Sequence, residues 1–337
     1  MATQTVSAPA EEKLYRVALR EALAEEMERD DSIFLIGEDI GKFGGAYRVT
    51  EGLLDRFGAQ RVFDAPIAEE VIVGTAVGAA MLGLRPVVEL MTVNFSLVAY
   101  DQIVNNAAKI RYMFGGESSV PMVIRMPGGA GHQLSAQHSH SLEVLYGLIP
   151  GLLVVAPTTP EDAKGLLKSA IRSDNPVMFL ESMSLYNVRG MVPAGDYTTP
   201  IGKAAIRRTG SDVTIVGVSR MAVLANEAAK QLEEDDIDAE VIDLRSIRPI
   251  DWAPIADSVR KTGRCVVVEE GWATYGVTAE IAAGVQERCF DYLDAPVRRL
   301  GGAQVPMPYS LLLEKAAIPT SEDIKRLVRS VLGRQDA

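Results

Sequence analysis

The stretch RVFDAPIAEEVIVGTAVGAAML, residues 61–82, decides the fold class. Arg61 to Asp64 has the pattern of a short strand, and Glu69 to Leu82 has the pattern of a helix rich in small and apolar residues. A strand followed by a helix is the unit from which parallel sheets are built, and open α/β sheets bind their ligands at the carboxyl ends of their strands. We therefore expect an α/β protein with a functional residue near this junction.

The junction offers two adjacent carboxylates, Glu69 and Glu70. A carboxylate at this place would also serve as a plain helix cap, because the N-terminal end of a helix favours negative charge. The pattern does not choose between the two glutamates, and we take Glu69 as the candidate for chemistry.

The alternation of β-branched runs with amphipathic helical patterns continues through two blocks of the chain. Its 337 residues leave room for two domains at roughly 100 to 200 residues each. The stretch SLYNVRGMVPAGDYTTP, residues 184–200, has no sustained period and is typical of a connection. We predict an N-terminal tail at 1–13, a first domain at 14–187, a linker at 188–203 and a second domain at 204–337, with mostly parallel sheets flanked by helices.

The individual elements follow from the same patterns. Strands are expected at 33–37, 61–64, 86–90, 122–126, 153–156, 177–181, 213–218, 239–244 and 265–269. Helices are expected at 14–28, 69–82, 161–172, 221–234, 252–261 and, after a cap at Ser321, to about residue 331. The segment from Glu89 to Lys109 is expected to run from a strand end into a helix.

Composition argues against several classes of partner. Lys and Arg number 34 against 45 Asp and Glu, so the formal net charge is -11 and no basic stripe favours nucleic acid. No apolar run reaches the ~20 residues of a membrane span, and residues 1–9 lack the patterns of a secretory signal or an organelle transit peptide. Cys265 and Cys289 have no CxxC spacing, so we interpret them as packing residues in a reducing, cytoplasmic compartment.

All three histidines of the chain, His132, His138 and His140, lie in the Gly-rich stretch RMPGGAGHQLSAQHSHSLE, residues 125–143. Three interpretations compete: a metal site, a catalytic histidine, or polar decoration of a long loop. Metal is the least favoured, because no paired carboxylate or cysteine accompanies the histidines. We favour one catalytic histidine. The chain has no P-loop, no GxSxG, no HExxH, no GxGxxG after the first strand and no GDG segment.

Further motifs run in order along nearly the whole chain: GEDIGKFGGAYRVTEGL (37–53), GLRPVVELMTVNFS (83–96), AQHSHSLE (136–143), DAKGLLKSAIRSDNPV (162–177), IDLRSIRPID (242–251), VVEEGW (267–272) and DAPVRRLGGAQVPMPY (294–309). Together with DAPIAEE, residues 64–70, they resemble the beta subunits of thiamine-diphosphate-dependent 2-oxo acid dehydrogenases of the pyruvate dehydrogenase type. The resemblance implies a two-domain transketolase-like build, with a pyrimidine-binding domain followed by a C-terminal transketolase domain.

The resemblance also implies roles for particular residues. Glu69 would hydrogen-bond a ring nitrogen of the aminopyrimidine of thiamine diphosphate and promote its imino tautomer. Phe95 would pack on that ring, and Met91 would line the same pocket. His138 matches the histidine used in passing the acyl unit to lipoamide, where an acid must protonate a leaving sulfur. His132 and His140 match no family role, and we expect them to be solvent-facing loop residues.

A structural K⁺ is a further expectation from the resemblance. The family's beta chains often bind this ion through backbone oxygens, and the matching positions are Met122, Ala170, Ile171, Ser173 and Asn175. Ser173 replaces an acidic residue that is common at that position in the family.

The resemblance implies partners as well. An alpha subunit would hold the diphosphate through Mg²⁺ with its GDG motif, in a heterotetramer of two alpha and two beta chains. The acceptor would be the lipoyl-bearing dihydrolipoyl acetyltransferase core. The implied reaction is that of pyruvate dehydrogenase (acetyl-transferring). Two alternatives stay open: a beta chain for acetoin or branched-chain 2-oxo acids, and a non-catalytic docking subunit.

Overall fold

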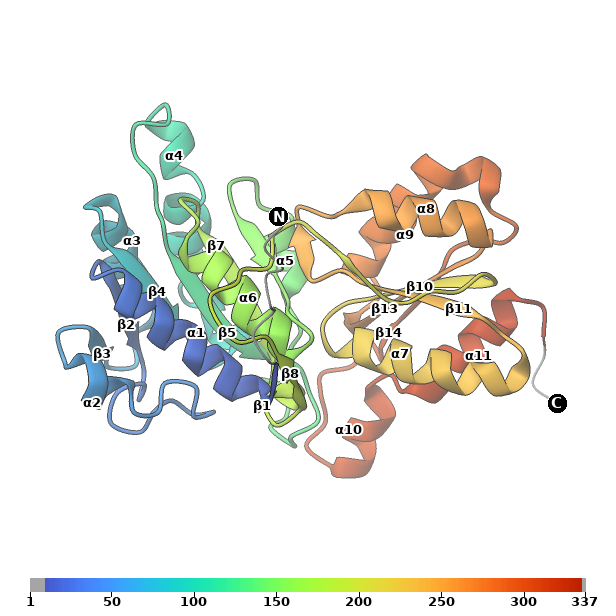
Figure 1. Cartoon of the computed structure of the whole chain (residues 1–337), viewed down its shortest axis with the longest axis horizontal. Coiled ribbons are helices and arrows are strands. Elements are labelled where there is room, and N and C mark those ends of the chain that lie inside the picture. Colours follow the sequence, from blue (N-terminus) through green and yellow to red (C-terminus); the bar gives the residue numbers. More distant parts are fainter. Residues whose placement is uncertain (1–9, 335–337) are drawn as a thin grey trace, which may run out of the picture.

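The computed structural model describes residues 10–334, which form two α/β halves that lie side by side (Figure 1). Within these residues, the first half is built on a seven-stranded sheet and the second on a five-stranded sheet, and a two-stranded ribbon accompanies them. The predicted fold class, two α/β units with mostly parallel sheets flanked by helices, is confirmed. Residues 1–9 of the expected tail and 335–337 lie outside the described part.

The first sheet has the strand order β12-β6-β7-β5-β4-β2-β3, and its pairs are parallel except for β12 with β6. Its strands are β2 (Ile33–Gly37), β3 (Val62–Asp64), β4 (Arg85–Glu89), β5 (Val123–Gly128), β6 (Leu153–Val155), β7 (Val177–Ser182) and β12 (Ser246–Arg248). The helical segments of this half are α1 (Tyr15–Arg29), α2 (Leu53–Phe57), α3 (Glu69–Met81), the 3-10 turn η1 (Val93–Leu97), the π-helix η2 (Gln102–Ala107), α4 (Ile110–Met113), α5 (Glu143–Gly147), α6 (Pro160–Ile171) and the 3-10 turn η3 (Met183–Leu185).

Both faces of the first sheet are covered. Val87 and Val123 pack into the cluster formed with α1 and α6, whereas their neighbours Val88 and Ile124 pack into the cluster formed with α3, η2 and α5. Successive residues of a strand point to opposite faces, so a strand that is buried on both faces is apolar at most of its positions. This explains why these strands are mainly apolar in the sequence and do not alternate with polar residues, apart from the buried charges of Glu89, Arg125 and Glu181.

The second sheet has the strand order β14-β13-β10-β11-β9, with only the edge pair β9 and β11 antiparallel. Its strands are β9 (Ala205–Arg208), β10 (Val213–Gly217), β11 (Ala239–Asp243), β13 (Cys265–Trp272) and β14 (Arg298–Gly302). The helical segments of this half are α7 (Arg220–Leu232), η4 (Glu233–Asp235), α8 (Trp252–Thr262), α9 (Val277–Cys289), η5 (Phe290–Tyr292), α10 (Leu311–Ala317) and α11 (Ser321–Val331).

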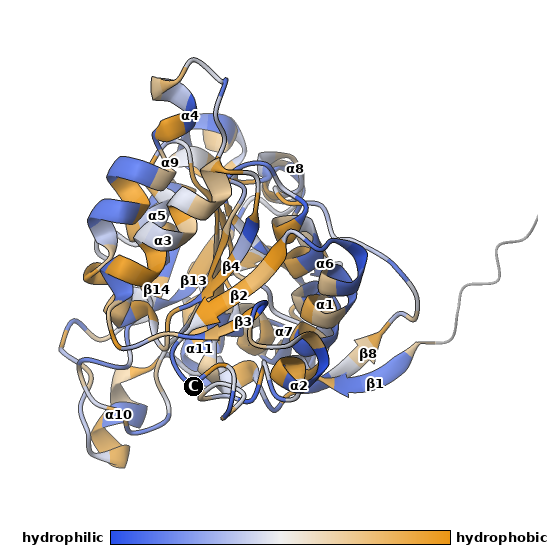
Figure 2. Ribbon diagram, turned by 90° about the vertical axis from the view of Figure 1, so that its left-hand side faces the viewer, coloured by the Kyte–Doolittle hydropathy of each residue, from blue (hydrophilic) through white to orange (hydrophobic). Residues whose placement is uncertain are grey.

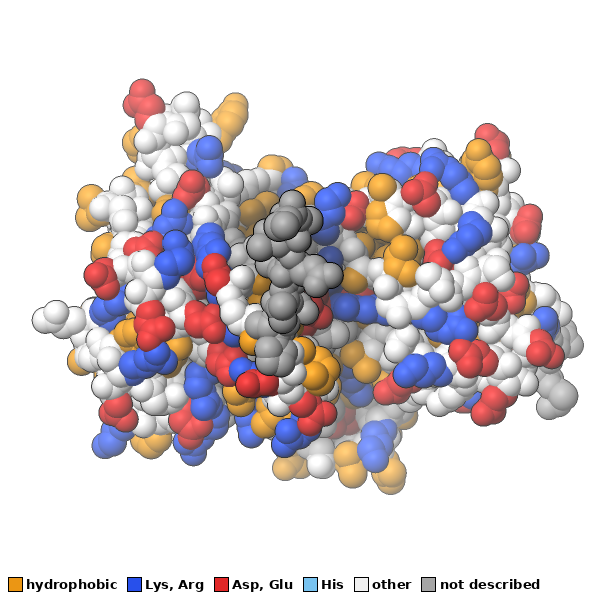
Figure 3. All heavy atoms as spheres, viewed as in Figure 1, with side chains coloured by type: hydrophobic (Ala, Val, Ile, Leu, Met, Phe, Trp, Pro, Cys, Tyr) orange, Lys and Arg blue, Asp and Glu red, His pale blue; other side chains and the backbone are white. Residues whose placement is uncertain are grey.

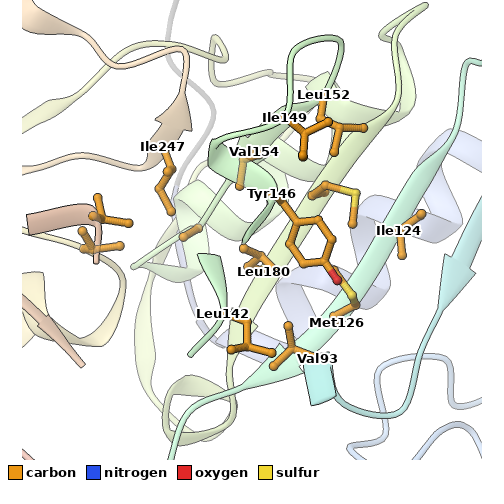
Figure 4. Packing of buried hydrophobic residues seen from close by; sticks show 14 of the residues in the cluster. Val93, Ile124, Met126, Leu142, Tyr146, Ile149, Leu152, Val154, Leu180 and Ile247 are labelled. Atoms are coloured by element: carbon orange, nitrogen blue, oxygen red, sulfur yellow. The ribbon is translucent and has the colours of Figure 1, made fainter. Parts of the chain in front are cut away.

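The two halves share one hydrophobic core. The cluster under α3 and α5 in the first half continues into the face of the second sheet that α8 and α9 cover. Tyr146 lies in the middle of this cluster among Ile124, Met126 and Leu180, and Ile247 reaches it from the second half (Figure 4). Ile247 belongs to β12, which pairs with β6 and so adds a strand from the second half to the first sheet.

The structure differs from the predicted elements at several places. The expected tail and linker supply β1 (Glu11–Leu14) and β8 (Arg189–Val192), which pair as an antiparallel ribbon. The segment expected to be one helix after Glu89 is divided into η1 and η2, and the Ser96 hydroxyl donates back to the carbonyl of Val93. Ser321 is not the cap of α11, since the Thr320 hydroxyl accepts from Asp323 N–H and the Asp323 carboxylate accepts from Thr320 N–H. The patterns also gave no specific prediction for α9, α10 or β14.

The face of the molecule that Figure 3 shows carries charges of both signs. On the face shown in Figure 3, basic and acidic side chains alternate over both halves. Among residues 10–334, no helix has the combination of length and apolarity that crossing a membrane requires.

A buried ion triad lies beneath the carboxyl end of the first sheet. The Arg125 side chain on β5 is 1% exposed and lies between two carboxylates: its Nη1 donates to Glu89 Oε2 at 2.6 Å, and its Nε and Nη2 donate to Glu181 Oε1 and Oε2 at 2.8 and 2.9 Å. The Tyr186 hydroxyl donates to Glu181 Oε2 at 2.7 Å. Burial raises the pKa of Glu89, and the charge of Arg125 opposes that rise. One guanidinium therefore joins β4, β5 and β7 in the sheet interior.

We predict that Arg125→Met destabilises the protein by roughly 3 to 5 kcal/mol, because it leaves two buried carboxylates without their partner. The loss should be larger at pH 8 than at pH 5, since the orphaned carboxyls can take up protons in acid. Urea unfolding at both pH values measures this. The surface control Arg189→Met, which removes a 3.6 Å pair with Glu12, should cost no more than about 0.5 kcal/mol. Equal losses in the two variants would contradict the role of the triad.

Candidate functional site

The candidate residues are brought together by the order of the strands. β5, β4, β2 and β3 are successive neighbours in the first sheet and run parallel, so their carboxyl ends lie along one edge. Glu38 follows β2, Glu69 opens α3 after β3, and Phe95 lies on η1 after β4. The histidine loop, residues 129–142, follows β5. Residues far apart in the sequence therefore converge at the edge where open α/β sheets bind ligands.

The structure separates the two glutamates that the sequence left equivalent. Glu69 is buried, with 6% of its surface exposed, whereas Glu70 is exposed. Glu38, also 6% exposed, is its electrostatic neighbour: burial raises the pKa of Glu38, and the charges of Glu69 and Asp39 raise it further. Glu38 Oε1 is buried with no hydrogen-bond partner among the described residues. Since buried polar atoms are nearly always paired, this oxygen indicates a place where a polar group is accommodated.

Phe95 and His138 face each other across the site. Their ring centroids lie 5.2 Å apart at an interplanar angle of 83°, an edge-to-face contact. Both side chains are half-buried, as is Met91, which lies two residues after the end of β4. Thr92 caps η1 by accepting from Asn94 N–H. The structure thus places an aromatic ring and an imidazole together, and the roles of both residues stay predictions.

His140 is half-buried and has more protein contacts than the solvent-facing loop residue that we expected. Asn94 Nδ2 lies 2.6 Å from His140 Nδ1, and His140 N–H donates to Asn94 Oδ1 at 3.3 Å. The side-chain amide of Asn94 therefore contacts both the ring and the backbone of His140. Trp272, from β13 of the second half, contacts the ring with centroids 5.4 Å apart. Burial lowers the pKa of His140, which favours the neutral ring that accepts from Asn94. His132, in contrast, is exposed as expected.

Sequence reasoning missed the contribution of the second half to this site. Trp272 and Glu270 belong to the segment VVEEGW, which served only as evidence of resemblance. Glu270 Oε1 accepts from Ala130 N–H at 2.5 Å, and Glu314 on α10 accepts from two further amides of the histidine loop. The only signal in the sequence was two acidic residues in an otherwise apolar strand.

A small polar cavity lies between the halves beside the histidine loop. Its volume is about 20 Å³, room for roughly one water molecule, and Glu143, Glu269 and Glu270 line it together with Arg220 and Ser182. Ser182 Oγ and Arg220 Nη1 are buried there without a hydrogen-bond partner among the described residues. Burial, with added repulsion from Glu269 and Glu270, raises the pKa of Glu143 to about 7.

A much larger cavity, of about 580 Å³, lies elsewhere between the halves. Its walls are mainly apolar and come from α5, β12, α8 and α9, including Leu148, Ile247 and Trp252. Glu69, Phe95 and His138 do not line it. The larger of these two cavities is therefore separate from the residues that converge at the sheet edge.

The positions expected to bind K⁺ already have hydrogen-bond donors. Arg85 Nη1 donates to the carbonyls of Ile171 and Ser173, at 3.0 Å each. The Asn175 carbonyl accepts from the Ser173 hydroxyl at 3.3 Å, and the carbonyls of Met122 and Ala170 accept from backbone amides. Each carbonyl oxygen has two lone pairs, so these hydrogen bonds are compatible with a bound cation, and the K⁺ stays a prediction. Among residues 10–334, no group of three or more His, Cys, Asp and Glu side chains could hold a metal ion.

Comparison with known proteins gives the family. Residues 11–189 match the transketolase pyrimidine binding domain, and residues 202–324 match the transketolase C-terminal domain. A relative from Rickettsia felis, named pyruvate dehydrogenase E1 component subunit beta, is 51% identical over 316 residues, covering 94% of this chain and 97% of that protein. The chain belongs to the family of pyruvate dehydrogenase E1 beta subunits.

Other E1 beta subunits match similarly well. The mitochondrial beta-1 subunit of Arabidopsis thaliana is 50% identical over 330 residues, with 97% of this chain and 91% of that protein covered. A solved split-gene transketolase, described as an inactive beta4 tetramer, has a TM-score of 0.77 at 25% identity, covering 98% of this chain and 100% of that chain. Both the domain-family matches and the solved structure therefore show the transketolase-like fold.

Membership in the E1 beta family raises the question whether this chain fits thiamine diphosphate. The sheet edge offers a buried carboxylate at Glu69, an unpartnered buried oxygen at Glu38 and an aromatic ring at Phe95. These groups fit a flat ring with nitrogen donors and acceptors, such as an aminopyrimidine. The described part of the chain offers no cluster of acidic ligands for the metal of a diphosphate, so the fit concerns the pyrimidine end only.

The raised pKa of Glu143 predicts a pH dependence of stability. Its folded value of about 7 lies above the ordinary value of 4.5, so the folded chain binds this proton more tightly and stability falls as pH rises from about 4.5 to 7. Glu143→Gln should therefore stabilise the protein at pH 8 by roughly 1 to 3 kcal/mol and change little at pH 4.5. Thermal unfolding at both pH values measures this, with the exposed Glu287→Gln as control. A lower melting temperature of Glu143→Gln at pH 8 would show that the sign is wrong.

Proposed function

We propose that this chain is the beta subunit of the decarboxylating component of a pyruvate dehydrogenase complex, and that it works with an alpha subunit. The observation that carries the proposal is the convergence of Glu69, Phe95 and His138 at the carboxyl ends of β3, β4 and β5 in a chain of this family. The reaction is the oxidative decarboxylation of pyruvate with reductive acetylation of a lipoyl group. The cofactor is thiamine diphosphate, which supplies the electron sink for loss of CO₂ when it is bound.

Glu69 acts at the pyrimidine end of the cofactor. Its buried carboxylate lies at the N-terminal end of α3 and makes no hydrogen bond to another side chain in the described part of the chain, so it is available to a ring nitrogen. A carboxylate there can hold a proton at that nitrogen and so favour the imino form of the ring. Phe95 and Met91, both half-buried, would pack against the ring and keep water away from it.

His138 acts in the transfer to the lipoyl group. When the two-carbon unit that remains after CO₂ loss is passed to the dithiolane, its carbon would bond to one sulfur while the S–S bond breaks and the other sulfur leaves. Release of the thioester would then break the bond between that carbon and the cofactor. The carbon unit is oxidised and the disulfide is reduced, and the leaving sulfur needs one proton. The imidazole of His138 supplies it, because a ring nitrogen that carries a proton can act as a general acid toward the leaving sulfur.

The alpha subunit supplies what this chain lacks. The sequence contains no GDG segment, so the diphosphate and its Mg²⁺ are held by the partner in this proposal. Large apolar side chains are exposed on and near α3 and α4, including Ile67 at 82%, Val71 at 64%, Leu82 at 88% and Tyr112 at 90%. Figure 2 shows α3 and α4 on the same side of the molecule, with hydrophobic stretches in both. Exposed apolar groups of this kind are typical of a surface that another subunit covers.

Three finer statements belong to the same proposal. The assembly is a heterotetramer of two alpha and two beta chains that delivers acetyl groups to a lipoyl-bearing dihydrolipoyl acetyltransferase core. The location is the cytoplasm, in keeping with two buried cysteines that form no disulfide. The K⁺ at the carbonyls near Ser173 stays a prediction, and no step of the mechanism uses it.

The first test replaces Glu69. In the chain co-expressed with its alpha subunit, supplied with thiamine diphosphate and Mg²⁺, Glu69→Gln should lower CO₂ release from pyruvate by at least about a hundredfold, because the proton-holding carboxylate is lost. The exposed neighbour Glu70→Gln is the matched control and should stay within about twofold. Full activity of Glu69→Gln would contradict the assigned role. Wild-type activity only on acetoin or 3-methyl-2-oxobutanoate would move the substrate, and none at all in a well-assembled complex would favour a docking subunit.

The second test separates the two half-reactions. His138→Ala should lower reductive acetylation of a lipoyl domain by roughly 10²- to 10⁴-fold, because the leaving sulfur loses its proton donor. Decarboxylation coupled to an artificial electron acceptor such as ferricyanide should change by less than about threefold, since no sulfur leaves there. The exposed His132→Ala is the control. Equal loss in both assays would assign His138 to decarboxylation instead.

A further inference from the structure

The backbone of the histidine loop presents a row of amides to the second half. Every second residue from Gly129 to Ser135 has a positive φ: +89° at Gly129, +104° at Gly131, +55° at Gln133 and +64° at Ser135. Alternation of left-handed residues with others turns successive N–H groups toward one side and forms a concavity that attracts anions. Here the anions come from the protein itself, because the amides of Ala130, Gly131 and Gln133 all donate to carboxylates of the second half.

Glu314 accepts from two of these amides. It lies on α10 and is 0% exposed. Its Oε1 accepts from Gly131 N–H and from Gln133 N–H, at 3.0 Å each, and its Oε2 lies 3.2 Å from the Gln133 nitrogen. A carboxylate is an expensive group to bury, so its hydrogen bonds to the loop are the main compensation visible for it.

Glu270 accepts from the third amide. It lies on β13, and its Oε1 accepts from Ala130 N–H at 2.5 Å while its Oε2 lies 3.7 Å from Arg220 Nη1. A side chain at position 129 would collide with it, since a Cβ on Gly129 would be 2.8 Å from Glu270 Oε1. The loop backbone therefore lies directly against this carboxylate.

The other side of the loop is fastened within the first half. Gly129 N–H donates to the His140 carbonyl at 2.8 Å and closes the neck of the loop. Asn94 holds both the backbone amide and the ring of His140, and the Ser184 hydroxyl donates to the Ala130 carbonyl at 3.2 Å. His138 lies between these two sets of contacts and faces Phe95.

We propose that Glu314 and Glu270 are positioning residues, which clamp the histidine loop from the second half and so set the place of His138 against Phe95. The inference rests on the proposed role of His138 in acyl transfer. It gives the second half a part in the site of the first half: two buried carboxylates fix the backbone that carries the proton donor. Positioning of this kind raises rate because the reacting groups no longer need to find their arrangement.

The first arm of the test measures the clamp itself in the assembled alpha and beta complex, by hydrogen–deuterium exchange. In Glu314→Ala, the amides of Gly131 and Gln133 should exchange roughly 10- to 100-fold faster, because they lose their buried acceptor. Glu314→Gln keeps one acceptor oxygen and should give an intermediate increase. Glu287→Ala on the exposed face of α9 is the matched control and should leave the loop unchanged. Unchanged exchange at both amides in Glu314→Ala would overturn the proposal.

The second arm measures what the clamp does for the reaction. In Glu314→Ala, kcat for reductive acetylation of a lipoyl domain should fall at least about tenfold, whereas decarboxylation with ferricyanide should stay within about twofold. Glu314→Gln and Glu270→Gln should show the same difference between the two activities, with a smaller fall in acetylation. An equal fall of both activities together with the melting temperature would reduce the two glutamates to structural residues and overturn the proposal. If Glu314→Ala does not assemble, the two isosteric Gln variants decide by the same split.

The two proposals fail in different ways. Absence of wild-type activity on pyruvate, or a His138→Ala variant that does not separate the two assays, would count against the proposed function. The exchange of Gly131 and Gln133 would still show whether Glu314 holds the loop, and faster exchange with an unchanged acetylation rate would retain the clamp but overturn its positioning role.

Discussion

The guanidinium of Arg125 is the contact on which the arrangement at the sheet edge depends. It is enclosed in the sheet, and it holds carboxylates from the strands on either side of its own. Each of the three strands leads directly into a segment of the site: β4 into Met91 and η1, β5 into the histidine loop, and β7 into η3, whose Ser184 contacts that loop. In a low-dielectric interior such a charge must be paired, so the three strand ends are fixed relative to one another before any cofactor binds.

The second half completes the site by contributing buried carboxylates. The first half supplies an aromatic ring, a buried carboxylate and a loop whose amides point outward, and the second supplies the carboxylates that accept from those amides. Backbone amides arranged in this way are poorly satisfied by water in a closed interface. Their hydrogen bonds to the carboxylates of the second half therefore fix the relative position of the two halves more closely than the shared apolar core can. Apolar packing is tolerant of small shifts, whereas hydrogen bonds near 3 Å are not.

Much of this could be predicted from the sequence, for reasons that are local. The strand and helix of residues 61–82 have strong periodic signals, and burial on both faces made the central strands conspicuous as apolar runs. Glu69 was already a candidate from the strand–helix junction, Phe95 and His138 were found through the resemblance, and the strand order explains why the three meet. What was missed is non-local: β1, β8 and β12 are short strands defined by distant partners, and the contacts of His140 with Asn94 and Trp272 join three segments that no local pattern connects. The sequence also could not show that Glu69 is buried and Glu70 exposed, because that depends on the orientation of α3 in the fold.

The three residues of β12 also bear on how such a chain could be divided. They lie far along the sequence, beyond the first three strands of the second sheet, yet they cover the edge of β6 in the first. A fragment that ended between the halves would leave β6 as an uncovered edge, and open edges recruit other strands, from a second molecule if need be. Gene-level rearrangements that separate the halves must therefore carry this short strand with the first half or replace it. The boundary between the two halves of the structure therefore does not correspond to a single position in the sequence.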